Sequence, residues 1–445
     1  MEKKVIIVGA GLVGSLWAVY MAKAGYKVTI YERRPDIRKA EISAGKSINL
    51  ALSHRGWKAI RNAGVEEEVK KIAIPMSGRI MHDTDGKLTY QPYGKKDEAI
   101  YSVSRGHLNA IMMDIAENKG RATIHYNHQC IGADLENGIV QLKDLKNNRE
   151  FEDSADLVFA ADGAFSAVRY NAMQKVDRFN YSQFYIEDGY KELLLPADEN
   201  GNYQIEKNAL HIWPRGRFML IALPNEDGSF TCTLFMPYEN HEYAFNDLDS
   251  DEKINTFFKT IFPDFHALMP NLIENWHQNP LSSLSIVRCY PWTMGKFALM
   301  GDSCHATVPF YGQGMNAGFE DCTVMWELYN QHQNWDETFK AYQKTRKADG
   351  DALQDLSLHN YYVMRDHVAN DDFLLQKKIE AKLHEKYPEK WIPLYSQVTF
   401  SHIPYSKAIA QGKKQDLIMK EILKEPSIHE IWDSEEIEYK ILSKL

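Results

Sequence analysis

The sequence has little of what marks secreted, zinc-binding or membrane-spanning proteins. Its five cysteines are scattered and never have C-x-x-C spacing, so neither a disulfide framework nor a zinc ribbon is expected. No apolar run approaches the roughly 18 residues of a transmembrane helix, and the N-terminal run MEKKVIIVGAG is too short for a signal peptide. We therefore expect a soluble, cytoplasmic protein with no membrane anchor in this chain.

Basic residues are also fewer than acidic residues. The chain has 52 Lys and Arg against 61 Asp and Glu, which gives a net charge of -9 at pH 7. A protein that binds nucleic acid or anionic membranes has a basic footprint instead, so neither partner is expected. The 445 residues, 44% of them hydrophobic, suffice for roughly two to four domain-sized units with ample cores.

Three strand–turn–helix units are present along the chain. The first begins with the β-branched run Lys4–Val8, continues with apolar residues at helical spacing up to Gly25, and reaches a second strand, KVTIYE. The segment ADLVFAADGAFSAVR, which ends at Arg169, repeats the pattern, and FALMGDSCHATVPFYGQGMNAGFED, which ends at Asp321, is the third unit. Such units predict an α/β, Rossmann-like fold.

The chain between and after these units has a different texture. The segments ALHIWPRGRFMLIALP and SFTCTLFMP are short aromatic and β-branched strands, which predict an antiparallel sheet inserted from Asn180 to about Pro291. After Val324 the chain is charged and helical in pattern, with DALQDLSLHNYYVMRDHVAND and DFLLQKKIEAKLHEKYPEK as long helix candidates. The prediction is therefore an α/β domain with an inserted sheet and a helical C-terminal region.

The first turn has the spacing of a dinucleotide-binding motif. Gly9, Gly11 and Gly14 spell G-x-G-x-x-G between a strand and a helix. The first glycine permits the tight turn, the second admits a pyrophosphate, and the third lets the helix pack closely on the strand. Glu32, at the end of the second strand, suits an unphosphorylated ribose. FAD or NAD is therefore favoured over NADP here, and the motif alone does not choose between them.

The third unit allows three interpretations. Asp302, Cys304 and His305 are too crowded along one turn to converge on a metal ion, so no metal site is expected. Cys304 and His305 are adjacent on what we expect to be an extended loop, where their side chains point apart and cannot form a nucleophile pair. The remaining interpretation is a cofactor cradle, in which Asp302 accepts a ribityl hydroxyl and the helix start GQGMN faces the flavin or its phosphate. His305 is then a structural or wall residue.

The second unit is less specific than the other two. Its strand delivers Asp162 and Gly163 to a turn, and Ser166 and Arg169 lie on the helix that follows. This arrangement fits either a capped helix behind a strand or a further part of the cofactor site.

Taken together and in this order, GAGLVG, AADGAFSAVR and LMGDSCHATVPFYGQGMNAGFED resemble the aromatic-ring flavin monooxygenases of the para-hydroxybenzoate hydroxylase type. Further stretches, among them GKSINLALSHRG, PMSGRIMH, YSVSRGHLN, HIWPR and IPLYSQVTFS, resemble the members of that family that hydroxylate L-kynurenine. The resemblance extends to about Ser401 and so covers nearly the whole chain. It implies an enzyme without a catalytic side chain, because bound FAD carries the chemistry.

The motifs and the resemblance together give the expected site residues. The expected FAD contacts are Gly9, Gly11, Val13, Gly14, Tyr31, Glu32, Arg33, Arg34, Ala51, Arg105, Cys130, Asp162, Asp302, Gly314, Met315 and Asn316. The resemblance implies that the amino-acid end of the substrate is held by Arg79, Tyr93, Asn360 and Tyr395. The expected pocket wall consists of Phe235, Pro309, Phe310, Tyr311 and Gln313. Relatives can carry a hydroxyl residue where this chain has Ala167, so no side-chain contact with FAD is expected there.

The chemistry of these side chains suits an amino-acid substrate. A guanidinium can donate two parallel charge-assisted hydrogen bonds to a carboxylate, while tyrosine and asparagine add neutral donors and acceptors. Without the resemblance, Arg79 would be interpreted as a solvated surface charge. Asn360 and Tyr395 would be interpreted as residues of a helical core.

The resemblance implies a reaction in two halves. NADPH reduces FAD by hydride transfer, and the reduced flavin then combines with O2 to form a hydroperoxide that converts L-kynurenine to 3-hydroxykynurenine, a step of tryptophan degradation. The chain has no second strand–GxGxxG unit for NADPH, so NADPH is expected to dock transiently. Two alternatives stay open: a related flavin hydroxylase of another aromatic acid, and an FAD reductase that does not hydroxylate.

We expect the chain to divide into three parts. The FAD-binding part comprises residues 1–75, 96–179 and 291–335. The substrate part comprises residues 76–95 and 180–290, and residues 336–445 form the helical C-terminal region.

Overall fold

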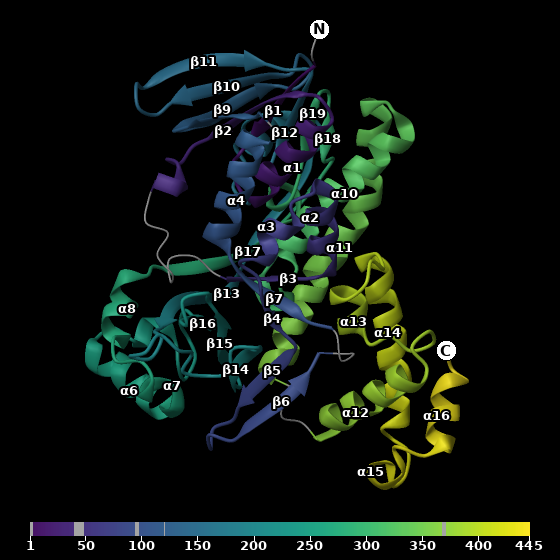
Figure 1. Cartoon of the computed structure of the whole chain (residues 1–445). Helices are drawn as coiled ribbons and strands as arrows, with labels where there is room; N and C mark the ends of the chain where they lie inside the picture. Colours follow the sequence, from purple (N-terminus) through teal and green to yellow (C-terminus); the bar gives the residue numbers. More distant parts are fainter. Residues whose placement is uncertain (1–2, 40–48, 94–97, 120, 367–370) are drawn as a thin grey trace.

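A computed structural model describes residues 3–39, 49–93, 98–119, 121–366 and 371–445 of the chain (Figure 1). Residues 45–48, which open the stretch GKSINLALSHRG, and residues 367–370 of the first long helix candidate lie outside the described residues. The described part contains four sheets. In Figure 1 the sheet around β1 lies in the upper half, the sheet around β14 in the lower half, and the C-terminal helices at the lower right.

The first large sheet is the α/β unit that the sequence predicts. In sheet order, its six strands are β18 (Thr293–Met294), β19 (Phe297–Leu299), β12 (Leu157–Ala160), β1 (Lys4–Val8), β2 (Lys27–Glu32) and β8 (Thr123–Tyr126). All neighbours pair in parallel except β18 and β19. The helix α1 (Leu12–Lys23) connects β1 to β2 and ends just before Gly25, as expected. The fold-class prediction is confirmed in this part of the chain.

The helices of this unit bury a continuous core. They are α1, α2 (His54–Ala63), α3 (Glu66–Lys70), α4 (Arg105–Asn118), α5 (Ala167–Asn171), α9 (Asp302–His305) and α10 (Gly314–His332). The helix α1 packs against α4 and α10. Trp17 on α1 is fully buried, and its ring lies edge-on to Phe159 of β12 with 5.1 Å between centroids. Burying such aromatic area is the main stabilising term for this layer.

The second large sheet contains the inserted strands. In sheet order, its seven strands are β17 (Leu281–Tyr290), β13 (Asn180–Leu195), β16 (Phe230–Pro237), β15 (Phe218–Pro224), β14 (Ala209–Arg215), β5 (Gly78–His82) and β6 (Leu88–Pro92). The neighbouring strands pair antiparallel, with the exception of β14 and β5. Three helices pack on this sheet: α6 (Asp251–Ile261), α7 (Pro263–Ala267) and α8 (Leu272–Gln278). The predicted antiparallel sheet is therefore present, and two strands from the first hundred residues extend it.

The two faces of this sheet have different partners. Trp213, Leu220 and Leu234 belong to the buried core that includes the aromatic residues of α6 to α8. Successive side chains of a strand point to opposite faces, so the neighbouring residues Ile221 and Thr233 point away from those helices. One sequence pattern thus builds a core on one face and leaves the other face for the candidate site.

A series of hydrogen bonds between side chains connects β5 to β14 and α7. His211 Nε2 donates to the carbonyl oxygen of Glu206 at 2.8 Å, and burial lowers the pKa of His211 to about 4, so its Nδ1 is an acceptor. His82 Nε2 donates to that nitrogen at 2.9 Å. His82 Nδ1 lies 2.8 Å from Asp264 Oδ2, which also accepts from Trp213 Nε1. Because a carboxylate only accepts, His82 Nδ1 donates to Asp264 and so links β5 to the start of α7.

Two small sheets were not predicted. One consists of β11 (Arg149–Ser154), β10 (Ile139–Asp144) and β9 (His128–Asp134), and the other of β3 (Asn49–Leu52), β7 (Ile100–Ser104) and β4 (Ile74–Met76). Both contribute residues to the cavity described below, including Cys130 from β9 and Ala51 from β3.

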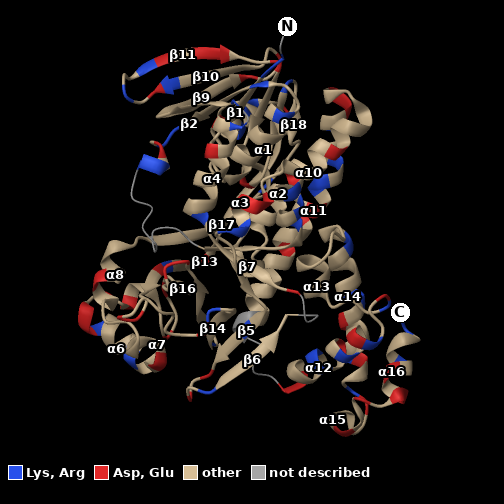
Figure 2. Cartoon of the chain, in the orientation of Figure 1, with Lys and Arg blue, Asp and Glu red and all other residues tan. Residues whose placement is uncertain are grey.

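The C-terminal region is helical, as predicted. Its helices are α11 (Trp335–Asp366), α12 (Asp371–Lys386), α13 (Leu394–Thr399), α14 (Tyr405–Ile422), α15 (Ile428–Ile431) and α16 (Glu435–Leu442). The fully buried Trp391 lies in a separate hydrophobic cluster with Leu383, Ile418 and Ile437. Figure 2 shows acidic and basic residues interspersed over these helices and the rest of the chain. Within the described residues, no helix combines the length and the apolar character needed to cross a membrane.

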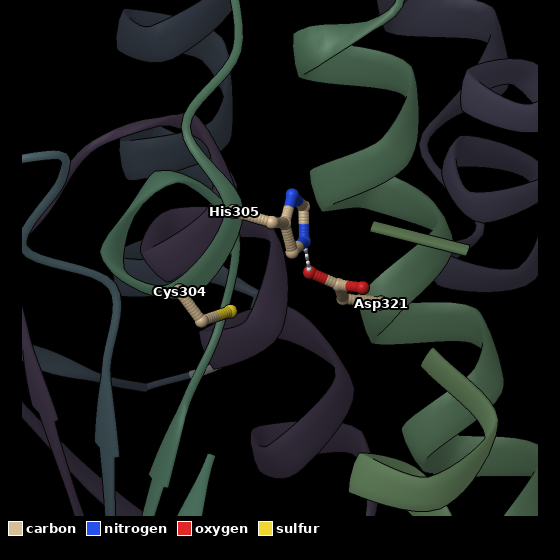
Figure 3. A group of neighbouring side chains, drawn as sticks. All are labelled: Cys304, His305 and Asp321. Atoms are coloured by element: carbon tan, nitrogen blue, oxygen red, sulfur yellow. Dashed lines mark hydrogen bonds and ion pairs between the residues drawn. The ribbon is translucent and has the colours of Figure 1, made fainter. Parts of the chain in front are cut away.

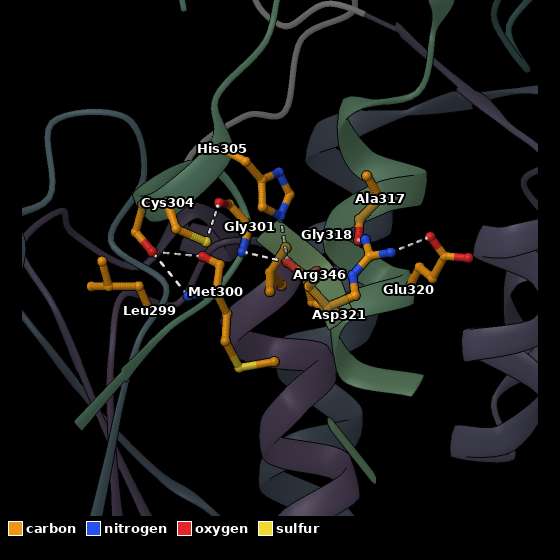
Figure 4. A network of polar contacts seen from close by, with 12 residues as sticks. Leu299, Met300, Gly301, Cys304, His305, Ala317, Gly318, Glu320, Asp321 and Arg346 are labelled. Carbon is orange, nitrogen blue, oxygen red and sulfur yellow. Dashed lines mark hydrogen bonds and ion pairs between the residues drawn. The ribbon is translucent and has the colours of Figure 1, made fainter. Parts of the chain in front are cut away.

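A buried ionic network holds the third strand–turn–helix unit in place. Asp321 on α10 is fully buried, and its Oδ2 accepts from His305 Nε2 at 2.6 Å (Figure 3) and from the backbone N of Gly301 at 2.8 Å. Its Oδ1 accepts from Arg346 Nε at 2.8 Å (Figure 4). Burial by itself would raise the pKa of Asp321, but the charges of His305 and Arg346 outweigh that effect and lower the pKa to about 2.

The same network reaches the C-terminal region. Arg346 on α11 also donates to Glu320 Oε2 at 2.7 Å, and Glu320 pairs through its other oxygen with Arg55 on α2. The Nε of Arg55 donates to the carbonyl oxygen of Val398 on α13 at 3.2 Å. Paired and hydrogen-bonded charges of this kind tolerate burial, and removing one partner is strongly destabilising. The turn after β19 is thereby fixed relative to α13.

Cys304, His305 and Asp321 meet a distance criterion for a metal site, because their ligand atoms lie within 4.8 Å of one another. Both oxygens of Asp321 already accept hydrogen bonds, and Arg346 places a positive charge beside them. Burial raises the pKa of the Cys304 thiol, which disfavours the thiolate that a metal needs. These residues are therefore part of an ion-pair cluster, and Cys304 and His305 lie on the short helix α9 instead of the extended loop that we expected.

We expect the free energy of unfolding to fall as the pH drops from about 4 to about 2. The pKa values of Asp321 and Asp264 are lowered from 3.8 to about 2 in the folded chain. Their stabilising contribution is therefore complete above the unfolded-state value and is lost as the pH falls through the folded-state value. Denaturant titrations at a series of acidic pH values measure this slope. In Asp264→Asn the slope should be shallower by up to about 1.4 kcal/mol per pH unit, and a slope equal to that of the unmodified protein would contradict the assignment.

Candidate functional site

A cavity of about 500 Å³ is lined by residues from both large sheets and from the C-terminal region. All the predicted FAD contacts line it except Gly14 and Asn316. The four predicted substrate residues line it as well, and so does the predicted wall apart from Gln313. The structure thus brings together segments that lie more than three hundred residues apart in the sequence, such as Gly11 and Tyr395.

Of the three motif glycines in and after the turn that follows β1, only Gly11 has open space beside it. Gly9 has a φ of +97°, and a Cβ there would lie 2.6 Å from the carbonyl oxygen of Ala161. A Cβ at Gly14 would lie 2.0 Å from the carbonyl oxygen of Gly9. By contrast, a Cβ at Gly11 would meet no atom within 4 Å, and no side chain caps the N-terminus of α1 there. The positive end of α1 is therefore accessible to an anionic group.

Glu32 is fixed at the end of β2, beside this turn. Its Oε2 accepts from the backbone N of Ala10 at 2.9 Å, and its Oε1 accepts from the backbone N of Arg34 at 2.9 Å. Burial would raise the pKa of Glu32, but the hydrogen bonds and charge of Arg34 outweigh it and lower the pKa. The carboxylate is therefore ionised at neutral pH and can accept hydrogen bonds from hydroxyl groups in the cavity.

The second unit places Asp162 against the cavity. Its Oδ2 accepts from the backbone N of Ala167 at 2.7 Å, while its buried Oδ1 has no hydrogen-bond partner within the described residues. Burial raises the pKa of this carboxyl group. Arg169 donates to the carbonyl oxygens of Ala164 and Ser303, so it joins the second unit to the third.

The third unit presents Asp302 to the cavity. Asp302 is the first residue of α9, its side chain is exposed, and it follows Gly301, which has a φ of +61°. The buried carboxylate of Asp321 accepts from the backbone N of Gly301. Asp302 is thus held from behind by the ionic network of α10 and α11.

The other end of the cavity is built for a small polar group. Arg79 on β5 donates from Nε to Gln91 Oε1 at 2.9 Å, and none of the ion pairs among the described residues includes it. The rings of Tyr93 and Tyr395 are stacked, with 5.3 Å between centroids. Burial raises the pKa of Tyr395 to about 12 and that of Tyr93 well above its usual value, so both hydroxyls stay protonated donors. Asn360 Nδ2 donates to the carbonyl oxygen of Phe310 at 2.7 Å.

Aromatic rings enclose the space between the two ends. Phe310 meets Phe235 edge-on at 4.9 Å between centroids and stacks on Tyr361 of α11 at 4.1 Å. Tyr311 stacks on Tyr395 at 5.8 Å. Packed aromatic walls of this kind keep bulk water away from a ligand.

Several buried polar atoms of the lining have no partner within the described residues. They are Asn49 Oδ1, Tyr93 Oη, Asp162 Oδ1, Thr233 Oγ1 and Thr307 Oγ1. Buried polar groups in folded proteins are nearly always hydrogen-bonded. Because these five atoms line a cavity, a ligand with several polar atoms can supply the partners that they lack.

Two predicted contacts turn their side chains elsewhere. The carboxamide oxygen of Gln313 accepts from Ser53 Oγ at 3.3 Å and from Tyr405 Oη at 3.2 Å, so Gln313 is not a wall residue of this cavity. Asn316 Nδ2 donates to the carbonyl oxygen of Ala51 at 2.8 Å, so its side chain supports the lining strand β3 from behind. Gly14 serves the packing of α1 on β1, as its place in the motif implies.

Sequence analysis missed the floor of the cavity. The floor is formed by the exposed face of the second sheet, with Leu210, Ile212, Met219, Ile221, Leu223 and Thr233. The alternating pattern of FMLIALP and FTCTLFMP predicts strands, but it does not tell which of two apolar faces meets a helix and which meets a ligand. Asn49 and Thr307 lie within the recognised stretches GKSINLALSHRG and LMGDSCHATVPFYGQGMNAGFED, but nothing in those stretches distinguishes them as polar residues of the lining.

FAD fits this set of residues. Gly11 leaves the space beside the α1 N-terminus that a pyrophosphate requires. Glu32 offers ionised oxygens at the place of a ribose, and Asp302 offers a carboxylate to a polyol chain. The partnerless Asp162 Oδ1 and Thr307 Oγ1 lie on the same side of the cavity as these groups, on the loops after β12 and α9. The cofactor site and the polar pocket at Arg79 are parts of one space.

Comparisons with known proteins agree with this assignment. A family model described as FAD binding domain matches residues 2–357. A kynurenine 3-monooxygenase of Flavobacterium psychrophilum is 49% identical over 446 aligned positions, which cover 100% of this chain and 99% of the relative. The protein of that name from Anopheles gambiae is 43% identical over 434 positions, which cover 95% of this chain and 87% of the relative.

Solved structures share the fold at much lower identity. 2-Methyl-3-hydroxypyridine-5-carboxylic acid oxygenase superimposes with a TM-score of 0.67 at 18% identity, covering 82% of this chain and 94% of that chain. The tetracycline destructase Tet(55) superimposes with a TM-score of 0.63 at 16% identity, covering 87% of this chain and 97% of that chain. The fold follows from these structures, and the sequence identity over the full length decides the family. This chain, an FAD-binding protein, belongs to the kynurenine 3-monooxygenase family.

Proposed function

We propose that this protein binds FAD and converts L-kynurenine to 3-hydroxykynurenine in the cytoplasm, with NADPH and O2 as co-substrates. The observation that carries the proposal is the continuity of one cavity. The dinucleotide turn at Gly11 and an arginine without a carboxylate partner among the described residues, Arg79, line the same space. That arrangement suits a cofactor and an amino-acid substrate bound side by side.

When bound, FAD supplies the redox chemistry, namely the acceptance of hydride from NADPH and the transfer of an oxygen atom from O2. Gly9, Gly11 and the N-terminus of α1 hold its pyrophosphate, and Glu32 and Asp302 accept hydrogen bonds from its hydroxyl groups. No side chain of this chain needs to act as a nucleophile.

Arg79 binds the carboxylate of the substrate. Its Nε is engaged by Gln91, which orients the guanidinium and leaves the terminal nitrogens for the ligand. Tyr93 and Tyr395 donate neutral hydroxyl hydrogen bonds beside it, and Asn360 adds an amide. Because these groups come from β5, the loop after β6, α11 and α13, the C-terminal region closes this end of the pocket.

The aromatic walls exclude water from the cavity. Phe235, Pro309, Phe310 and Tyr311 surround the space between the cofactor turn and the carboxylate site. An electron-rich aniline ring needs no protein base to react with an oxygen electrophile. The protein therefore contributes orientation and the exclusion of water, which would otherwise intercept the oxidant.

The purified protein should be yellow and should form 3-hydroxykynurenine from L-kynurenine with NADPH in air. Mass spectrometry of the product, alongside NADPH consumption, measures this directly. Anthranilate and para-hydroxybenzoate serve as comparison substrates. Hydroxylation of one of these but not of L-kynurenine would indicate a related aromatic hydroxylase, and NADPH consumption without any hydroxylated product would indicate a reductase.

Arg79→Met should weaken the binding of L-kynurenine by about 10- to 100-fold, because charged hydrogen bonds of roughly 1.5–3 kcal/mol are lost. The FAD content should stay unchanged. Arg79→Lys is the matched variant, because it keeps the positive charge but cannot donate two parallel hydrogen bonds. Its affinity for L-kynurenine should lie between the affinities of the wild type and of Arg79→Met. Equilibrium titrations of the oxidised protein measure all three, and wild-type affinity in Arg79→Met would refute the carboxylate assignment.

Gly11→Val should fold but fail to retain FAD. A Cβ at this position meets no protein atom within 4 Å, so the new side chain starts in open space and occupies the room that the pyrophosphate needs. Gly14→Ala is the contrasting variant and should be strongly destabilised, because its Cβ would lie 2.0 Å from the carbonyl oxygen of Gly9. Visible flavin absorbance and circular dichroism separate the two outcomes. A fully flavinated Gly11→Val would count against the dinucleotide turn.

A further inference from the structure

Thr233 is a polar residue in the middle of an apolar floor. It lies on β16, its exposed fraction is 1%, and it lines the cavity. Its Oγ1 has no hydrogen-bond partner among the residues that the structure describes. Leaving a buried hydroxyl unpaired costs free energy, whereas valine would fill the same volume without that cost. The hydroxyl therefore indicates a ligand group that pairs with it.

The register of the sheet places Thr233 on the face that also carries Arg79. Thr233 lies opposite Ile221 of β15, and Ile221 lies opposite Ile212 of β14. Arg79 of β5 lies opposite Leu210 of β14, one row along. Residues that face one another across strands point to the same side, and all five line the cavity.

The separation of Thr233 and Arg79 suits the two ends of one substrate molecule. Their strands are three spacings apart, which together with the offset along the strands puts their backbones roughly 15 Å apart. Arg79 lies on β5, next to the edge strand β6, and its Nε donates to Gln91 of β6. The cavity continues from Arg79 to Thr233, so one ligand with a carboxylate at one end and a polar ring substituent at the other can lie between them.

The other partnerless threonine hydroxyl of the lining, that of Thr307, belongs to the cofactor side. Its Cγ2 is the nearest neighbour, at 3.7 Å, of a Cβ built on Gly314, the first residue of α10. Thr233 instead has Ile221 and Phe235 beside it on the floor. A polar ligand atom over the floor therefore has Thr233 as its partner.

We propose that Thr233 accepts a hydrogen bond from the aryl amine of the substrate. The proposal rests on the proposed function, because it takes an aminoaryl amino acid as the ligand. With the carboxylate held at Arg79, a second contact at Thr233 prevents the ring from rotating about its bond to the ketone carbon. That rotation exchanges the two ring carbons meta to the ketone, of which one is ortho and the other para to the amine, so Thr233 is a positioning residue that decides which of the two is presented for hydroxylation.

Thr233→Val tests the contact with a nearly isosteric side chain, and Thr233→Ser is the matched control that keeps the hydroxyl. Isothermal titration calorimetry of the oxidised holoenzyme gives the dissociation constants of three ligands. These are L-kynurenine, its analogue without the aryl amine, and its analogue with the ketone reduced to methylene. Flavin content and the thermal midpoint verify that each variant is folded.

Thr233→Val should bind L-kynurenine and the ketone-free analogue about 5- to 20-fold more weakly than the wild type. It should bind the amine-free analogue with unchanged affinity, and Thr233→Ser should stay within about threefold of the wild type for all three. In Thr233→Val, a larger share of the NADPH consumed with L-kynurenine should yield no hydroxylated product.

Other results overturn the assignment. An equal loss for all three ligands would show a purely structural role, and no loss for any would show that the hydroxyl is not used. A loss that persists with the amine-free analogue and vanishes with the ketone-free analogue would transfer the contact to the ketone. Wild-type protein that binds none of the ligands would instead refute the proposed function itself.

Discussion

The ionic network around Asp321 is the constraint on which the site depends. A cofactor cradle needs backbone and carboxylate groups held rigidly at the edge of a cavity, and the turn between β19 and α9 brings one such carboxylate, that of Asp302, to the cavity. Asp321 holds the turn through Gly301, and Arg346 carries the connection onward through Glu320 and Arg55 to α13. The helix that supplies Tyr395 is thus fixed to the same charges as the loop that supplies Asp302. Buried charges can do this because each is paired and hydrogen-bonded.

In the seven-stranded sheet, the two-residue alternation of the strands places side chains in two different environments. Alternate residues of β14, β15 and β16 face either the helices α6 to α8 or the cavity, and almost all of them are apolar. The helical face obtains its stability from close packing. The cavity face needs the same apolar character for a different reason, which is the exclusion of water from an aromatic ligand. Thr233, a polar residue that lines the cavity, marks the second use.

Sequence reasoning succeeded where chemistry restricts the choice of residue. The bounds of β1 and β2, the turn at Gly9 and Gly11, and the carboxylates Glu32 and Asp302 all follow from local rules of strand, turn and helix start. Sequence reasoning failed where the deciding interaction is with a residue that is distant in the sequence. Gln313 is in the recognised stretch GQGMN, yet its side chain points to Tyr405, ninety-two residues away in the chain. The small sheet of β9 to β11 also went unpredicted, because its strands belong neither to a strand–turn–helix unit nor to the inserted aromatic strands. The division into FAD-binding, substrate and C-terminal parts stays a prediction.

The parallel pairing of β5 with β14 has a consequence for how the chain is made. Arg79 emerges from the ribosome about 130 residues before the strand that it must pair with, since β14 begins at Ala209. Contacts so distant in sequence form late, because a long loop must close first. The strand that carries Arg79 therefore stays exposed while more than a quarter of the polypeptide is still being synthesised. A hydrophilic arginine and the solvent-facing partner strand β6 suit a segment that has to remain soluble during that delay.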